Sequence, residues 1–129
     1  VEWKKEPSKN YFECARGFSP SGKNIELTVD ADRPGPTQVQ KDFFHSVENQ
    51  YDELTAAMAP LIESKFREWE TSFRIGDFRS ELDPVFMALP RCDKQPIIWE
   101  LAFQLVSNRN FHITVHLESF EAKAIEVDT

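Results

Sequence analysis

The sequence is poor in glycine and cysteine, and it has no long apolar run. With four glycines among 129 residues, a glycine-rich phosphate loop is improbable, and no Gly-x-Ser-x-Gly, Cys-x-x-Cys or His-Glu-x-x-His motif occurs. No stretch approaches the roughly 18 apolar residues that span a membrane. The first thirty residues also lack a signal-like apolar core. These absences argue against a nucleotide loop, the common hydrolase signatures and an integral membrane protein, and they make a cytoplasmic location the default expectation.

The two cysteines, Cys14 and Cys92, are too few for a disulfide framework. Each lies in an apolar-flanked stretch, where cysteine packs as a small hydrophobic side chain. We therefore expect two buried thiols in preference to a single disulfide.

The chain is rich in acidic side chains and in phenylalanine. It carries a net charge of −7 and includes 11 phenylalanines. The acid is concentrated: residues 37–70 hold seven acidic and three basic side chains, and residues 118–129 hold four and one. Phosphate binding needs a basic stripe, so a nucleic-acid partner is not expected. The distribution suits either a solvated surface or an acidic face that meets a basic protein.

Alternating apolar residues predict strands at both ends of the chain. Residues 11–15 and 25–29 have strand character, and the turn signal at 19–22 predicts an N-terminal hairpin. Residues 97–106 and 111–117 alternate on either side of a hairpin loop at 107–110, and a last strand follows at 122–127. One apolar and one polar face per strand is typical of an antiparallel sheet covered on one side.

A long helical segment is predicted to begin at Thr37. Pro34 and Pro36 cannot donate hydrogen bonds within a sheet, so they end the preceding strand. Thr37 and Gln40 have the spacing of a capping box. Apolar residues then recur at three- and four-residue steps and predict two amphipathic helices, roughly 37–49 and 52–70. The residues with this period are Val39, Phe43, Phe44, Val47, Tyr51, Leu54, Met58, Leu61, Ile62, Phe66 and Trp69.

Residues 71–96 have the least regular pattern. Phe73, Ile75 and Phe78 are compatible with a short strand, and residues 83–90 with one helical turn or an extended passage. The whole chain, residues 1–129, is predicted to be a single two-layer α+β domain. Its antiparallel sheet has about five to six strands and is covered on one face by two helices inserted after an N-terminal hairpin. Residues 1–10 are expected to form an arm or an edge strand.

Two patterns suggest a metal site, and neither completes one. Asp30 and Asp32 precede a glycine as in a calcium loop, but Pro34 and Lys41 occupy positions at which an EF-hand loop needs ligands. Neither a metal nor a cofactor is therefore expected.

The second pattern is a set of side chains on one face of the strand at 111–117. His112 and His116 share this face with Glu118, but four residues along a strand span about 13 Å, too far for two rings to share one ion easily. We keep these three residues as weak metal candidates. A cross-strand acid such as Glu100 would be needed to complete a site with one of the histidines.

Carboxylates crowd the predicted helices. Paired carboxylates act as catalytic acids and bases in a cleft that shifts their pKa values, whereas these are spread along an exposed helical face. We therefore expect no enzyme, and we treat these carboxylates as contacts for a basic protein partner. They are Glu48, Asp52, Glu53, Glu63 and Glu68.

The tryptophans Trp69 and Trp99 fall on apolar faces and are predicted to be core residues. An exposed tryptophan or phenylalanine near an acidic rim would instead be an anchor for a protein partner.

Two short motifs carry a family resemblance: Gly-Pro-Thr-x-x-Gln at 35–40, and Trp-Glu-Leu-x-Phe at 99–103 with the hairpin that follows. With the order of the elements, they resemble a group of small bacterial proteins of unknown function, the DUF6985/DUF2004-like kind. Some such proteins are found among the immunity proteins of bacterial toxin systems. The resemblance covers about residues 25–129, and it implies no catalytic residues, because that group has no established active site. Residues 107–110 depart from the acidic–histidine–glycine turn that those proteins often have.

The sequence therefore favours a non-enzymatic protein-binding module of bacterial type, immunity-like by resemblance, with an acidic helical face against a basic partner. One alternative is a small-ligand or metal-binding domain that uses the polar sheet face. The other is a structural subunit that covers its sheet face by forming a homodimer.

Overall fold

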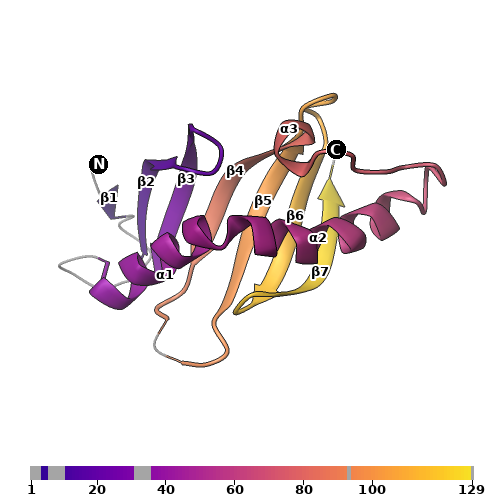
Figure 1. Ribbon diagram of the computed structural model, residues 1–129. Helices are drawn as coiled ribbons and strands as arrows, with labels where there is room; N and C mark the ends of the chain where they lie inside the picture. Colours follow the sequence, from indigo (N-terminus) through magenta and orange to yellow (C-terminus); the bar gives the residue numbers. More distant parts are fainter. Residues whose placement is uncertain (1–3, 6–10, 31–35, 93, 129) are drawn as a thin grey trace.

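The computed structural model describes residues 4–5, 11–30, 36–92 and 94–128, which form one sheet and one helical layer (Figure 1). The strands are β1 (Lys4–Lys5), β2 (Tyr11–Phe18), β3 (Lys23–Asp30), β4 (Leu82–Leu89), β5 (Ile98–Leu105), β6 (His112–Glu118) and β7 (Glu121–Asp128). The helices are α1 (Gln38–Asn49), α2 (Tyr51–Phe66) and the single turn α3 (Phe78–Glu81). The predicted α+β class, the N-terminal hairpin and the two substantial helices are confirmed.

The strands lie side by side in chain order, from β1 to β7. Neighbouring strands are antiparallel, with the exception of β3 and β4, which run parallel. The alternation of the strands did not reveal this pair. Its cause is the connection, because α1 and α2 cross the strands and the segment from α2 to α3 returns the chain to the end of the sheet at which β3 began (Figure 1).

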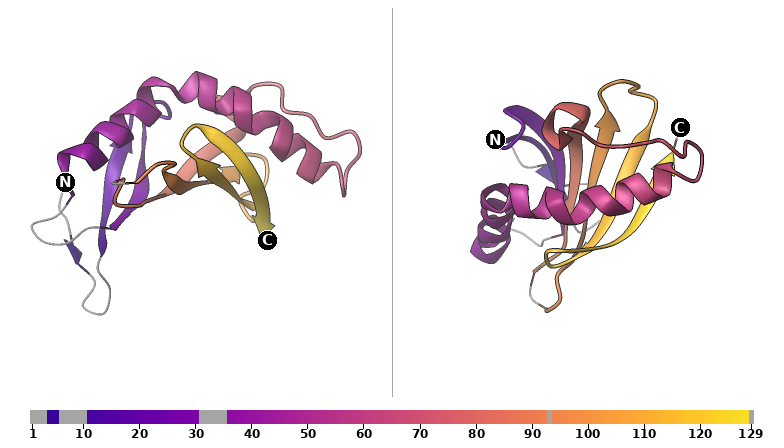
Figure 2. Two further views of the ribbon diagram at one scale, coloured as in Figure 1. Left: turned by 90° about the horizontal axis from the view of Figure 1, so that it is seen from below. Right: turned by 45° about the vertical axis from the view of Figure 1, so that its right-hand side comes forward.

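Both long helices lie on the same face of the sheet (Figure 1, Figure 2). Met58 and Ile62 of α2 pack there with Leu27, Leu101 and Val115 of the strands, and each of these side chains is at most 3% exposed. Burial of such a side chain contributes about 1.5–3 kcal/mol. We call the other face, which no helix of the described residues covers, the open face.

The N-terminus of α1 is fixed to the sheet by Gln40, a buried polar residue that is 1% exposed. Its side-chain oxygen accepts a hydrogen bond from the Thr37 backbone N–H at 2.9 Å, and the Thr37 hydroxyl accepts one from the Gln40 N–H at 3.2 Å. The predicted capping box is thereby confirmed. The Gln40 Nε2 also donates to the carbonyl oxygens of Asp30 and Pro90, each at 2.8 Å. One amide therefore joins α1 to the last residue of β3 and to the residue that follows β4.

The break between the helices is at Gln50, which ends α1 and precedes α2. Asp52 lies in the first turn of α2, and the cap position before that helix is occupied by Gln50. Residues 31–35, which include Asp32 and Pro34 of the predicted strand end, lie outside the described residues, as do most of residues 1–10.

The prediction that the second helix extends to residue 70 is wrong, because α2 ends at Phe66. The backbone turns after this residue, with the N–H of Trp69 donating to the Phe66 carbonyl at 3.0 Å. The side chain of Arg67 then donates to the carbonyl of Phe73 at 3.0 Å. These contacts turn the chain away from the helix axis.

The short strand expected around Phe73 and Ile75 is also absent from the structure. The backbone N–H of Ile75 is bound by the Glu63 carboxylate at 2.8 Å, and that of Gly76 by the Glu81 carboxylate at 2.8 Å. Because these backbone N–H groups donate to side-chain carboxylates, they are not available for pairing with another strand. The extended alternative for the next residues is confirmed, since Leu82–Leu89 forms β4.

We expect Gln40→Glu to lower the free energy of unfolding by about 2–4 kcal/mol. A carboxylate cannot donate to the carbonyls of Asp30 and Pro90, and its charge would be buried. Gln38→Glu makes the same chemical change two residues earlier at an exposed position, so it should cost less than about 0.5 kcal/mol. Urea unfolding measures both values. Equal losses would contradict a joining role for Gln40.

Candidate functional site

Two of the predicted partner-binding carboxylates hold backbone amides of the chain itself. Glu48 accepts a hydrogen bond from the N–H of Ser19 at 2.9 Å and contacts His45 at 3.0 Å, with its side chain 12% exposed. Glu63 accepts from the N–H of Ile75. These carboxylates stabilise the β2–β3 turn and the segment after α2, so little of either is left for a partner.

The other three candidates on the helices are more exposed. Asp52 forms an ion pair with Arg79 at 2.7 Å, and Glu68 lies 3.8 Å from Lys65. Glu53 is exposed and has no ion pair within the described part of the chain. The helical layer therefore presents a mixed surface, in which most carboxylates have a basic neighbour.

The weak metal candidates lie on the open face of β6 but do not converge. His116 lies between two carboxylates on neighbouring strands, with its Nδ1 3.4 Å from Glu100 and its Nε2 in contact with Glu126. The strand pairing thus places the cross-strand acid Glu100 beside one of the two histidines. His112 is exposed, two strand positions beyond Thr114. Among the described residues, no three histidine, cysteine or acidic side chains are arranged to hold a metal ion.

Cys14 and Cys92 do not form a disulfide, as the sequence predicted. Cys92 is buried and Cys14 is half-buried. Burial raises the pKa of the Cys14 thiol, which keeps it protonated and a poor nucleophile near neutral pH.

The prediction that Trp69 is a core residue is wrong, because its side chain is 63% exposed. It lies after the end of α2, so the helical period does not carry it to the core, and Val39 is similarly exposed at 56%. Trp99 is buried as predicted, and its Nε1 donates to the carbonyl of Ser119 at 2.7 Å.

The Trp69 side chain borders an aromatic groove of about 530 Å³ beside α2. The ring of Phe66 stacks on Phe73 at 4.5 Å and meets Phe111 edge-on at 5.7 Å, and Glu70 completes one wall. The charges around the groove are mixed, because Lys65 and Glu68 form an ion pair nearby.

The open face carries a different pattern, made of two adjacent rows of residues that run across β2–β7. We call them the central rows. The first is Glu13, Thr28, Ala88, Glu100, His116 and Ala124. The second is Ala15, Glu26, Phe86, Ala102, Thr114 and Glu126. On β2–β7, four positions are glutamates, six are alanine or threonine, and none is lysine or arginine. On β1, the first row continues at Lys4, which pairs with Glu13. The rows therefore form a surface of low relief with acidic charge.

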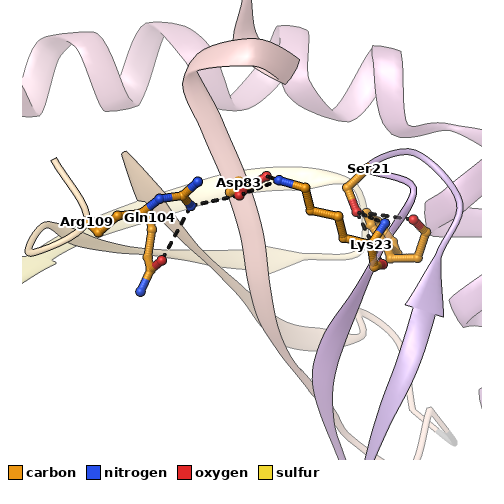
Figure 3. Close-up of polar contacts among 6 residues, drawn as sticks. Ser21, Lys23, Asp83, Gln104 and Arg109 are labelled. Carbon is orange, nitrogen blue, oxygen red and sulfur yellow. Dashed lines mark hydrogen bonds and ion pairs between the residues drawn. The ribbon is translucent and has the colours of Figure 1, made fainter. Parts of the chain in front are cut away.

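Two cations at one end of the open face are bound by Asp83 on β4 (Figure 3). Lys23 Nζ lies 3.1 Å and Arg109 Nη1 2.7 Å from the Asp83 carboxylate, which they approach from opposite sides. Burial of this carboxyl raises its pKa, but the hydrogen bonds from Arg109 and Lys23 outweigh that effect and leave the pKa below its ordinary value. Lys23 and Arg109 are thus directed to Asp83 and not to the glutamates of the central rows.

A groove of about 550 Å³ lies where β2, β3 and β4 meet, and we call it the seam groove. Glu13 and Glu26 border it, and the Phe86 ring contributes the aromatic part of its lining. Ala15 and Thr28 lie between them. The groove therefore combines two carboxylates with an aromatic ring on a surface of small side chains.

Sequence reasoning missed Glu13, Glu26 and Phe86 as a group. Alternation along 25–29 already places Glu26 on the polar face of its strand. Its position beside Phe86 depends on the parallel pairing of β3 and β4, which joins residues 60 positions apart. No local pattern contains that information.

Comparisons with protein-family models, curated proteins and solved structures found no match for this chain. The resemblance to small bacterial proteins, including immunity proteins, therefore stays a prediction. Within the described ranges, no helix is long and apolar enough to cross a membrane.

We expect Asp83→Asn to lower the free energy of unfolding by about 1 kcal/mol at neutral pH. Because the pKa of Asp83 is lowered by folding, its carboxylate stabilises the protein above a pH of about 4 and loses this effect as the pH falls below it. The difference in the free energy of unfolding between Asp83→Asn and the unsubstituted protein should therefore disappear at acidic pH. Asp77→Asn, at an exposed position, is the control and should show no such pH dependence. A difference that persists in acid would contradict the charge network.

The two tryptophans should respond very differently to truncation. Trp99→Ala removes a buried ring and should cost about 3–5 kcal/mol. Trp69→Ala should cost less than about 1 kcal/mol, because most of that ring is exposed. Thermal or urea unfolding of the two variants tests this, and a large loss from Trp69→Ala would place the ring in the core.

Proposed function

We propose that the protein is a non-enzymatic binding module that receives the basic surface of a protein partner on the open face of its sheet. The observation that supports this proposal is the composition of the central rows, which contain four glutamates and no lysine or arginine. An immunity-like role is the form of this function that the sequence resemblance implies.

The dimensions of the open face suit such a contact. Six strands of seven or eight residues cover about 29 Å by 26 Å, or roughly 750 Å², at the usual strand spacing and rise. One side of a standard protein–protein interface buries about 800 Å². Alanine and threonine allow a partner to approach the backbone closely, and the glutamates favour a basic partner by charge complementarity.

The open face supports this proposal better than the helical face favoured by the sequence. Glu48 and Glu63 are engaged by backbone amides, and Asp52 is paired with Arg79. Glu26 has no such contact in the described residues, and Glu13 has Lys4 of β1 as a neighbour in the strand register. A partner would therefore meet the uncompensated charge of Glu26 on the sheet and mostly compensated charge on the helices.

Two other functions are less well supported. A homodimer formed through the open face would place the glutamates of one copy against those of the other, and opposed like charges disfavour association. A metal-binding domain would need ligands that converge, and the described histidines and carboxylates do not.

A pair of matched double substitutions distinguishes the two faces. Glu26→Lys with Glu118→Lys reverses two charges on the open face, and Glu53→Lys with Glu70→Lys reverses one exposed charge on α2 and one in the segment after it. Both change the net charge equally. We expect the first pair to weaken partner binding at least about tenfold, or 1.4 kcal/mol, and the second less than about threefold.

The measurement begins with capture of partners from a lysate of the cells that make the protein, at low salt, followed by titration of the purified partner. The supporting result is a basic protein retained by the unsubstituted chain and the helical variant and released by the open-face variant. If the helical pair releases it instead, the helical face is the binding surface. If no partner is retained at low salt, the binding function itself is contradicted.

A further inference from the structure

The seam groove is the part of the open face with the most specific chemistry. It lies at the boundary between the N-terminal hairpin and the strands that follow the helices, where β3 meets β4 (Figure 1). Its volume of about 550 Å³ and its lining by Glu13, Glu26 and Phe86 set it apart from the flatter surface across β5–β7.

Phe86 is placed unusually for a phenylalanine in this chain. It lies between Glu26 and Ala102 in its row, on the face away from the helices, and it does not belong to the hydrophobic core cluster. Its side chain is half-buried. An aromatic ring at the surface presents a negative face, and a cation is the ligand that such a face attracts.

The two carboxylates strengthen that attraction, and no lysine or arginine of the described residues lines the groove with them. Glu26 pairs across the strands with Ala15 and Phe86, which are uncharged, whereas Glu13 pairs with Thr28 on one side and with Lys4 of β1 on the other. The cations Lys23 and Arg109 are bound by Asp83. The lining of the groove therefore combines two carboxylates with an aromatic ring, and the carboxylate beside that ring, Glu26, has only uncharged neighbours in the strand register.

We propose that the seam groove binds an arginine side chain of the basic partner. The guanidinium group lies against the Phe86 ring and donates hydrogen bonds to the carboxylates of Glu13 and Glu26. This inference rests on the proposed function and names the side chain that the open face recognises.

Arginine fits these groups better than lysine for geometric reasons. The guanidinium group is planar, so it stacks on a ring while its edge still donates several hydrogen bonds. It can therefore serve both carboxylates without leaving the aromatic surface. An ammonium group is a compact, strongly hydrated charge, and it loses more of its hydration in a groove with an aromatic wall.

The test uses two short capped peptides, one of alternating arginine and glycine and one of alternating lysine and glycine, titrated by NMR at low salt. We expect the arginine peptide to bind at least about fivefold more tightly than the lysine peptide. The largest amide shifts should lie at Glu13, Glu26 and Phe86.

Three variants separate the groove from the general charge of the face. Glu26→Gln and Phe86→Leu should each weaken the arginine peptide at least about fivefold, and Phe86→Leu should also abolish the preference for arginine. Glu118→Gln removes one charge from the same face outside the groove, so its effect should stay below about twofold. Urea unfolding checks that all three variants are folded.

The possible results separate this inference from the proposed function. Equal binding of both peptides, weakened equally by Glu26→Gln and Glu118→Gln, would overturn the arginine site and leave the acidic docking face standing. Shifts confined to α1 and α2, or no binding of either peptide, would overturn both. An arginine preference that Phe86→Leu leaves intact would overturn the role of the ring.

Discussion

The side-chain amide of Gln40 is the contact on which the arrangement of the two layers depends. It is buried, its oxygen completes the cap of α1, and its nitrogen reaches the carbonyls of Asp30 and Pro90. Two distant chain segments and the start of a helix thus meet at one side chain. An unsatisfied polar group in such a place would cost about 1–3 kcal/mol, so the helix has little freedom to shift relative to the strands.

This constraint explains why the molecule has a covered face and an open face. With α1 fixed at the ends of β3 and β4, α2 continues across the remaining strands on the same side (Figure 2). The connection also returns the chain so that β3 and β4 run parallel. That pairing places Glu26 beside Phe86, and the seam groove is a consequence of the same geometry that closes the core.

The acidic residues of the protein fall into two groups that differ in what their carboxylates contact. Carboxylates of the helical layer such as Glu48 and Glu63 accept hydrogen bonds from backbone amides of the chain, so their charge stabilises the fold itself. A carboxylate of the central rows such as Glu26 lies between Ala15 and Phe86, which offer it no positive charge. Net charge counted along the sequence does not separate these groups, because both contribute equally to the total of −7.

Local patterns in the sequence determined the secondary structure and its amphipathic faces. The period of the helices, the Thr37–Gln40 capping box and the alternation of the late strands are all short-range signals, and each was confirmed. The failures lie between residues 67 and 78, where the Glu63 and Glu81 carboxylates take the backbone amides, and at Trp69, which lies beyond the last turn of α2. The tertiary structure alone decided which strands are neighbours, and with it the seam groove. Its residues come from three strands, and the pairing that joins Glu26 to Phe86 spans the whole helical connection, a distance over which periodicity carries no information.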